Sequence, residues 1–241
     1  MSPSESGWWP QALPSLNLGT LLTVIEFIRA AGLRLGLPLV EQSLCGAGKR
    51  IDRRALHRLS CYALASGRLA RHAAISDLII RALRPEGAPF AGHLHQRAAA
   101  PISERTLPPD GLTIEPWPRG RRVILDVTVE DTFGPSYLGI AHDARAVAAK
   151  AEVVKRAKYE SLQQDFLFVP FIIGSTGVWG ERALKFVKEF GRQIASREGN
   201  RGAAAFIRQR MSVEMQRGNS RLIAGGFLQC GGLREFGSLS G

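Results

Sequence analysis

The chain has 241 residues, of which 45% are hydrophobic and 22% charged, a composition typical of a globular protein with one sizeable core. Lysine and arginine number 32 against 21 acidic residues, which gives a net charge of +11. This excess predicts a polyanionic partner, nucleic acid before an anionic membrane surface. The 26 glycines and 13 prolines follow no fixed period, which excludes collagen and wholesale disorder.

The N-terminal region predicts neither a signal peptide nor a membrane span. Residues 1–15 lack a basic and an apolar region, so we expect a flexible leader. Leu18–Leu35 is the most apolar stretch, but Glu26, Arg29 and Arg34 interrupt it, which favours an amphipathic helix, expected at Leu16–Leu35. Three cysteines in the whole chain are too few for a disulfide framework. A reducing compartment, nuclear or cytoplasmic, is therefore expected.

The order of the following elements predicts an α/β fold. Residues 16–65 form the helix and a basic segment, residues 66–220 the main domain, and residues 221–241 a Gly-rich tail. In the main domain, apolar periodicity and turn residues predict a small mixed sheet flanked by helices. Its expected elements are a helix at Ala70–Arg84, a long loop at 86–109, a hairpin of strands at Leu112–Trp117 and Arg122–Glu130, a helix at Ala144–Gln164, a buried strand at Phe166–Ile173, and helices at Trp179–Ser196 and Gly202–Gln216.

Two aspartates belong to the predicted hairpin. Asp110 opens one strand and Asp126 lies inside the other, on the face opposite to that of Val123 and Val127. A hairpin brings such positions side by side, so both carboxylates can share one ion. Mg²⁺ favours a few carboxylate oxygens completed by water and phosphate oxygens.

Two lysines and a tyrosine share a stripe of the next helix. At about 100° per residue, Lys155, Lys158 and Tyr159 point the same way, toward the sheet. A lysine there can orient the attacking water or stabilise charge on a scissile phosphate. The alternative is that Asp126 is an edge-strand charge, Asp110 a turn residue, and both lysines solvated. That alternative is favoured for each residue alone, whereas their combination in this order favours a site.

Several motifs together resemble the restriction-like endonuclease domain of site-specific non-LTR retrotransposons, which belongs to the PD-(D/E)XK nuclease superfamily. The resemblance extends over roughly residues 30–220. It rests on the strings Pro109-Asp110-Gly111-Leu112-Thr113, Leu125-Asp126-Val127-Thr128-Val129 and Lys155-Arg156-Ala157-Lys158-Tyr159, with Arg71-His72 and Ser175-Thr176-Gly177-Val178-Trp179-Gly180 around them.

The resemblance implies a restriction-endonuclease-like fold and a Mg²⁺-dependent DNA endonuclease that cuts target DNA for retrotransposition. It implies that Asp110 and Asp126 bind Mg²⁺ and that the catalytic lysine has moved from the strand to the helix. Thr128 stands where the usual lysine would be, so Lys155 or Lys158 would take the catalytic role. Asp77 is a candidate accessory acid. The alternative is a nucleic-acid-binding remnant that has kept the fold and lost the chemistry.

A cysteine–histidine group precedes the main domain. Cys45, His57 and Cys61 resemble the last three ligands of the CCHC zinc knuckle found before the nuclease in these elements. The first ligand would lie near Gln42, where no cysteine stands. Zinc needs four ligands, so a knuckle that no longer binds metal is favoured over a zinc site. In either case the short chain between the three residues predicts that they converge.

Two basic segments are expected to contact DNA phosphates. Residues 45–72 carry a net charge of +6, and residues 179–221 carry +6 as well. DNA is the expected partner, and the resemblance adds RNA or a reverse transcriptase module. No membrane and no small-molecule substrate is expected. The candidate phosphate contacts are Arg53, Arg54, Arg58, Arg71, Arg182, Lys185 and Lys188.

Overall fold

The computed structural model describes residues 7–83, 91–92, 109–113, 120–134, 137, 139–140 and 143–225. Most of the loop expected at 86–109 lies outside the described residues. Residues 114–119, which include most of the strand predicted at Leu112–Trp117, also lie outside the described residues. So does the Gly-rich tail from residue 226 onward.

In the part of the chain that the structure describes, the main sheet has four strands in the order β3-β4-β5-β6. The short strands β3 (Ala91–Gly92) and β4 (Gly111–Leu112) pair antiparallel with each other, and β4 pairs antiparallel with β5 (Val123–Glu130). The long strand β6 (Leu167–Gly174) pairs parallel with β5 along its whole length. A parallel pair needs a crossover connection, and the helix α3 (Ala144–Lys158) provides it. The prediction of an α/β fold with a small mixed sheet flanked by helices is confirmed.

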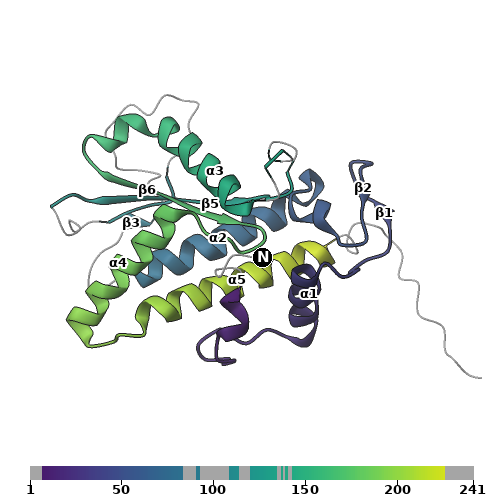
Figure 1. Cartoon of the computed structure of the whole chain (residues 1–241), viewed down its shortest axis with the longest axis horizontal. Helices are drawn as coiled ribbons and strands as arrows, with labels where there is room; N and C mark the ends of the chain where they lie inside the picture. Colours follow the sequence, from purple (N-terminus) through teal and green to yellow (C-terminus); the bar gives the residue numbers. More distant parts are fainter. Residues whose placement is uncertain are drawn as a thin grey trace, which may run out of the picture.

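Helices cover both faces of this sheet. In Figure 1, α3 lies on one side, and the helices α2 (Ala65–Ala82), α4 (Glu181–Glu198) and α5 (Ala203–Ala224) lie on the other. The alternation of β5 decides which side chain meets which layer. Val123, Leu125 and Val127 pack toward α2, α4 and α5, whereas Ile124 packs with Tyr159 at the end of α3. The predicted division of this strand into two faces is confirmed.

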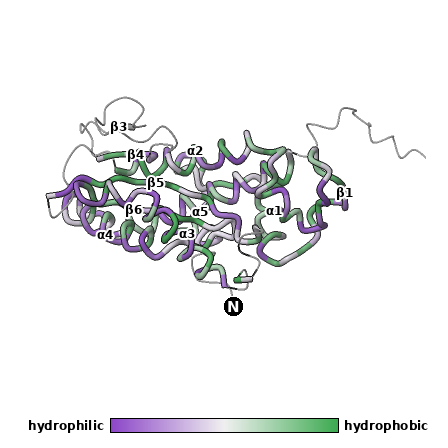
Figure 2. Tube along the Cα trace, turned by 90° about the horizontal axis from the view of Figure 1, so that it is seen from above, coloured by the Kyte–Doolittle hydropathy of each residue, from purple (hydrophilic) through white to green (hydrophobic). Residues whose placement is uncertain are grey.

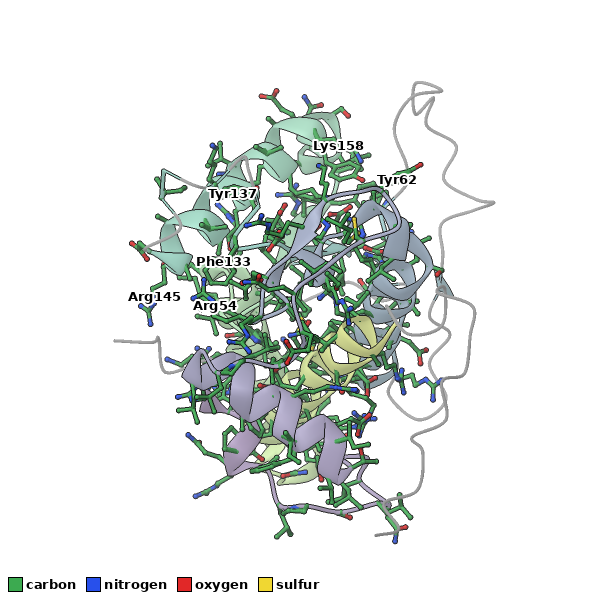
Figure 3. All side chains as sticks on the ribbon, turned by 90° about the vertical axis from the view of Figure 1, so that its right-hand side faces the viewer. Arg54, Tyr62, Phe133, Tyr137, Arg145 and Lys158 are labelled. Atoms are coloured by element: carbon green, nitrogen blue, oxygen red, sulfur yellow. The ribbon has the colours of Figure 1, made fainter. Side chains whose placement is uncertain are left out.

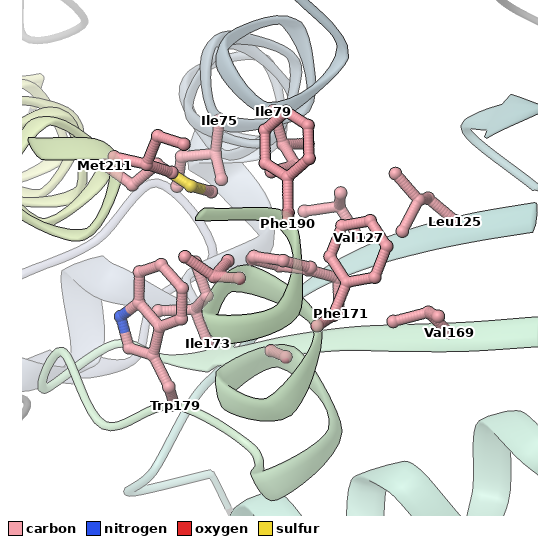
Figure 4. Close-up of a cluster of buried hydrophobic side chains, with 14 of the residues drawn as sticks. Ile75, Ile79, Leu125, Val127, Val169, Phe171, Ile173, Trp179, Phe190 and Met211 are labelled. Carbon is pink, nitrogen blue, oxygen red and sulfur yellow. The ribbon is translucent and has the colours of Figure 1, made fainter. Parts of the chain in front are cut away.

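The main core lies between the sheet and the three-helix layer. Figure 4 shows Val127 and Phe171 from the strands meeting Ile79 from α2 and Phe190 from α4. Phe171 is fully buried, and burial of such apolar side chains is the main favourable term in folding. Figure 2 accordingly shows β5 largely in the hydrophobic colour, whereas hydrophilic colour gathers on α4.

The ends of several helices differ from those that periodicity predicts. The first helix, α1, runs from Val24 to Leu35 and begins eight residues later than predicted. Thr23 accepts a hydrogen bond from the Glu26 backbone, and the Glu26 carboxylate accepts one from the Thr23 backbone. This capping box fixes the start, and Gly36 ends the helix at a φ of 69°. In the main domain, α2 begins at Ala65, α3 ends at Lys158, and α5 continues to Ala224.

The part of the N-terminal leader that the structure describes is packed rather than flexible. Residues 7–15 include a short 3-10 helix, Trp9–Gln11, that lies against α5. Trp9 and Ala12 are buried in a cluster with Ala30 of α1 and Val213 of α5. A flexible leader is therefore wrong for these residues, because the apolar surface of Trp9 is more favourable buried than exposed to water.

The structure contains no helix, among the residues it describes, that is long and apolar enough to cross a membrane.

A buried carboxylate fixes the start of α4 against α3. Glu152 is 8% exposed, and its Oε1 atom accepts a hydrogen bond from the backbone N–H of Arg182 at 2.9 Å. Gly180 at the N-cap has no side chain to make this bond, and a Cβ there would lie 2.3 Å from Glu152 Oε1. Glu152 thus caps α4 from a neighbouring helix, and glycine at 180 makes room for it.

We predict that Glu152→Ala lowers the free energy of unfolding by about 1–2 kcal/mol, the loss expected when a helix cap is removed. The same substitution at the exposed Glu160 should change stability by less than about 0.5 kcal/mol. Urea unfolding followed by circular dichroism measures both. Equal losses would show that Glu152 has no special role.

Candidate active site and metal-binding group

Asp126 is a charged residue in the middle of the sheet. It lies on the α3 side of β5, and only 4% of its surface is exposed. Its Oδ2 atom lies 2.8 Å from Lys155 Nζ and accepts a hydrogen bond from Thr128 Oγ1 at 3.2 Å. A buried carboxylate without partners would be costly, so these two contacts account for its place in the sheet.

Asp110 stands opposite Asp126 at the end of β4. The register pairs Gly111 with Leu125 and Leu112 with Ile124, and one further step pairs Asp110 with Asp126. The Asp110 Oδ2 atom accepts a hydrogen bond from the backbone N–H of Val127 at 2.7 Å. At the end of β4, the Asp110 carboxylate therefore accepts the hydrogen bond that the backbone of a neighbouring strand would otherwise accept from β5. The side-by-side position expected from a hairpin is confirmed by this register.

His72 of α2 binds the same point of β5. Its Nε2 atom lies 2.9 Å from the carbonyl oxygen of Val127 and 3.5 Å from Asp110 Oδ1. The hydrogen bond and charge of Asp110 raise the pKa of His72 above its usual value, against an opposing effect of burial. No role was assigned to His72 from the sequence. The signal is present, because His72 continues the sheet-facing stripe of Ile75 and Ile79 one turn toward the N-terminus.

Lys158 and Tyr159 form the outer part of the cluster. Lys158 Nζ donates a hydrogen bond to the Tyr159 hydroxyl at 2.9 Å and lies 4.6 Å from the centre of its ring. Tyr159 is 4% exposed, and its pKa is raised by burial and by the negative charge and hydrogen bond of Asp126. The pKa of Lys158 is lowered, first by burial and then by the positive charge of Lys155.

The structure thus brings together Asp110, Asp126, Lys155 and Lys158. Both carboxylates influence the pKa values of His72, Lys158 and Tyr159, so the two negative charges act on one shared region. Lys155 contacts Asp126 directly, whereas Lys158 is turned to the hydroxyl of Tyr159. The catalytic roles of these residues stay predictions.

A cleft opens along β5 beyond the end of β4. Its volume is about 440 Å³, and Lys155, Thr128 and Glu130 line it from the α3 side of the sheet. His72 and Arg68 of α2 line it from across the strand. Among the described residues, β4 pairs with β5 only as far as Leu125, and no strand pairs with the second half of β5 on that side.

The residues Cys45, His57 and Cys61, which we call the knuckle group, converge as predicted. Cys45 follows the two-residue strand β1 (Ser43–Leu44), and its backbone pairs with Lys49 just before β2 (Arg50–Ile51). His57 lies in a short 3-10 helix, with Nε2 3.3 Å from Cys45 Sγ.

The ligand atoms of the knuckle group all lie within 4.8 Å of one another, so the group can hold a metal ion such as zinc. Cys61 is 2% exposed. Burial acts to raise the pKa of the Cys45 thiol, but hydrogen bonds with His57 and with the backbone of Ala47 and Lys49 outweigh it and lower that pKa to about 6. A thiol with a lowered pKa is more readily the thiolate that binds metal.

A second cavity, of about 300 Å³, lies beside the knuckle group. His57, Cys61 and Tyr62 line it on one side, and Glu130 and Tyr137 line it on the other. Figure 3 labels Tyr62 and Tyr137 on the side of the molecule that faces the viewer. The two hollows share Ser60, Glu130 and Asp131, so the space beside the knuckle group adjoins the cleft that His72 and Lys155 line.

Two of the predicted phosphate contacts are structural instead. Arg58 is 5% exposed and donates a hydrogen bond to the carbonyl oxygen of Ile223. Arg71 is also 5% exposed and donates to Asn219 Oδ1 at 2.6 Å and to the Leu59 carbonyl at 3.1 Å. Arg58 and Arg71 join the knuckle region and α2 to α5, so the prediction that they contact phosphate is wrong. Both are buried residues that support the fold, and the charge pattern of a sequence does not distinguish such residues from exposed ones.

The remaining predicted contacts lie on the surface. Arg53 and Arg54 are more than half exposed and pair loosely with Glu41 and Asp52. On α4, Arg182, Lys185 and Lys188 are exposed, and Lys185 pairs with Glu181 at 2.6 Å. Exposed pairs of this kind contribute little to stability, so these side chains can exchange partners for phosphate.

Asp77 does not join the carboxylate cluster. Its Oδ2 atom lies 2.7 Å from Arg81 one turn further along α2, and its side chain is 52% exposed. The helix turns Asp77 away from the stripe of His72, Ile75 and Ile79 that faces β5. The prediction that Asp77 is an accessory acid is therefore wrong, and Asp77 forms a surface ion pair with Arg81 instead.

Comparisons of the chain with models of protein families and with curated proteins found no match.

The raised pKa of His72 predicts a pH-dependent contribution to stability. Protonated His72 is stabilised by Asp110, so this contribution is complete below the unfolded pKa near 6.5 and is lost as the pH rises through the folded pKa. His72→Gln removes the titrating group but can still donate to the Val127 carbonyl. The wild type should exceed this variant in unfolding free energy by more at about pH 6 than at about pH 9. Urea unfolding at both pH values tests this, and a constant difference would contradict it.

Proposed function

We propose that this protein is a Mg²⁺-dependent DNA endonuclease derived from a non-LTR retrotransposon. The observation that carries the proposal is the alignment of Asp110 opposite Asp126 across β4 and β5, with Lys155 Nζ 2.8 Å from Asp126. Carboxylates without a functional role are seldom buried, and here the buried Asp126 has the partly buried Asp110 opposite it in the register and Lys155 beside it.

The donor set fits a magnesium ion. Asp110 and Asp126 offer hard carboxylate oxygens, and each oxygen keeps acceptor capacity beyond the hydrogen bonds it already makes. Mg²⁺ is commonly held by one or two carboxylates, with water and substrate phosphate completing its octahedron. When bound, the ion would lower the pKa of a coordinated water and stabilise negative charge on the phosphate.

The protein side chains would each support one part of phosphodiester hydrolysis. Asp110 and Asp126 would hold the ion, and Lys155 would orient the attacking water and stabilise charge that develops on the phosphate. His72 would hold Asp110 in place from α2, because it contacts both Asp110 and Val127. Lys155 is favoured over Lys158 as the catalytic lysine, since Lys158 Nζ is bonded to the Tyr159 hydroxyl.

DNA would approach along the cleft at the edge of β5. Arg68 and Lys155 line the cleft, and the exposed basic residues near the knuckle group lie at residues 49–54. Such contacts would position the phosphate backbone without reading its sequence, so binding should be strongly salt-dependent. RNA or a reverse transcriptase module is proposed as a further partner only through the family resemblance.

A nucleic-acid-binding remnant is the second candidate. The observation in its favour is Gln42, an exposed glutamine where the fourth ligand of a zinc knuckle is expected. Loss of one ligand is typical of an element that has begun to decay. The intact cluster of Asp110, Asp126 and Lys155 favours the enzyme.

We predict that the wild type converts supercoiled plasmid to nicked circle with Mg²⁺ but not with EDTA. Asp126→Asn should reduce the nicking rate by at least about 100-fold, as expected when a metal ligand is lost. DNA binding should persist, because basic residues and not Asp126 would contact phosphate. The matched control is Asp77→Asn, which changes an exposed aspartate paired with Arg81 and should leave nicking unchanged.

Three results would count against the enzyme. Wild-type protein that binds DNA in a salt-dependent manner but does not nick it would support the remnant. Nicking that survives Asp126→Asn would mean that the active site lies elsewhere. Equal loss with Asp77→Asn would point to a general defect rather than to the loss of a metal ligand.

We predict that Lys155→Arg reduces nicking by about 100-fold or more, whereas Lys158→Arg has a much smaller effect. Arginine keeps a positive charge beside Asp126, which preserves the buried ion pair, but its planar guanidinium differs in shape and donor geometry from the ammonium group that would orient the water. Thermal unfolding checks that both variants are folded. The reverse order of effects would assign the catalytic role to Lys158.

A further inference from the structure

The knuckle group has three ligands, whereas a tetrahedral zinc site has four positions. Among the described residues, no other histidine, cysteine or carboxylate joins Cys45, His57 and Cys61 in this group. Gln42 lies three residues before Cys45, the spacing of paired zinc ligands, but offers no thiol and is exposed. Closed sites with four protein ligands are typical of structural zinc, whereas three ligands leave a position for water or another donor.

The surroundings indicate where the remaining position opens. Two of the three ligands, His57 and Cys61, line the cavity of about 300 Å³ that Tyr62, Glu130 and Asp131 complete. Two of the three ligand residues therefore border a space large enough for a water molecule or a small donor. A donor entering this cavity reaches the group without displacing one of its three ligands.

The charges around the cavity favour a neutral donor over an anion. Two thiolates and a neutral imidazole would balance the charge of Zn²⁺. The far wall adds the carboxyl groups of Glu130 and Asp131, against one lysine, Lys49, among the lining residues. An entering anion would meet this negative charge, whereas an imidazole nitrogen would not.

We propose that the knuckle group binds one zinc ion through Cys45, His57 and Cys61 and leaves a fourth position that exchanges with neutral nitrogen donors of the imidazole type. The site is thus open and exchangeable rather than a closed structural knuckle. This inference concerns residues outside the proposed nuclease site, so it is tested independently of DNA cleavage.

The test is a cobalt titration of the full-length reduced protein, because Co²⁺ reports its coordination through visible absorption. One equivalent should bind, and Cys61→Ser should abolish this binding. Added imidazole should shift the spectrum of the wild type at lower concentration than added azide. Gln42→Cys supplies the missing thiolate and should remove the shift, whereas the matched control Gln42→Ser should respond as the wild type does.

Each other outcome overturns a part of the proposal. Absence of metal binding by the folded wild type would show that the group is not a metal site. A wild-type spectrum that does not respond to imidazole would show that a residue of the chain already fills the fourth position. A stronger response to azide would contradict the preference for neutral donors, and a Gln42→Cys variant that still responds would show that position 42 does not reach the metal.

Discussion

The buried ion pair between Asp126 and Lys155 is the contact on which the arrangement of the site depends. It joins the central strand to the helix that covers it, with 2.8 Å between the charged atoms. Removing either partner would leave a charge in a poorly solvated place, which costs far more than an exposed pair contributes. The pair also fixes the rotation of α3, because its C-terminal turn must face the strand for Lys155 to reach Asp126. Tyr159 lies against Ile124 and Phe168 as a result.

The strand β4 is short and, among the described residues, pairs with only the first part of β5. Beyond Asp126, no strand of the described residues pairs with β5 on that side, and side chains contact its backbone at Val127 instead. Asp110 accepts from the Val127 N–H, and His72 contacts the Val127 carbonyl oxygen. Exposed strand edges attract unwanted pairing, and covering one with charged side chains avoids it. His72 also lines the cleft, together with Lys155, the ion-pair partner of Asp126, so the edge of the strand and the site share residues.

The region before the main domain is integrated with it through α5. Arg71 of α2 donates to Asn219, which donates to the Ser175 carbonyl after β6, so one buried network joins three elements. Gly218 permits this contact, because a Cβ there would lie 2.4 Å from Arg71 Cγ. Arg58 anchors the knuckle region to the end of the same helix. The knuckle group is therefore held at a fixed place beside the end of β5, and its cavity adjoins the cleft of the proposed nuclease.

The sequence by itself determined the elements whose patterns are local. Alternation in Val123–Glu130 predicted both the strand and the face of Asp126, and the apolar run before Gly174 predicted a second, buried strand. Helical spacing placed Lys155 and Tyr159 on one stripe. The short separation of Cys45 from Cys61 predicted their convergence. These inferences succeed because the periods of strand and helix fix side-chain directions without reference to the rest of the chain.

Only the tertiary structure decided which charges are buried and which partners they take. Arg58 and Arg71 resemble surface residues in sequence, and only the approach of α5 encloses them. Helical spacing places His72 on the sheet-facing stripe of α2, but its partners Val127 and Asp110 follow only from the packing of α2 against β5. Trp9 is held by α5, some 200 residues away in the chain. Burial and pairing depend on contacts between distant segments, and charge counts or periodicity contain no information about which distant segments meet.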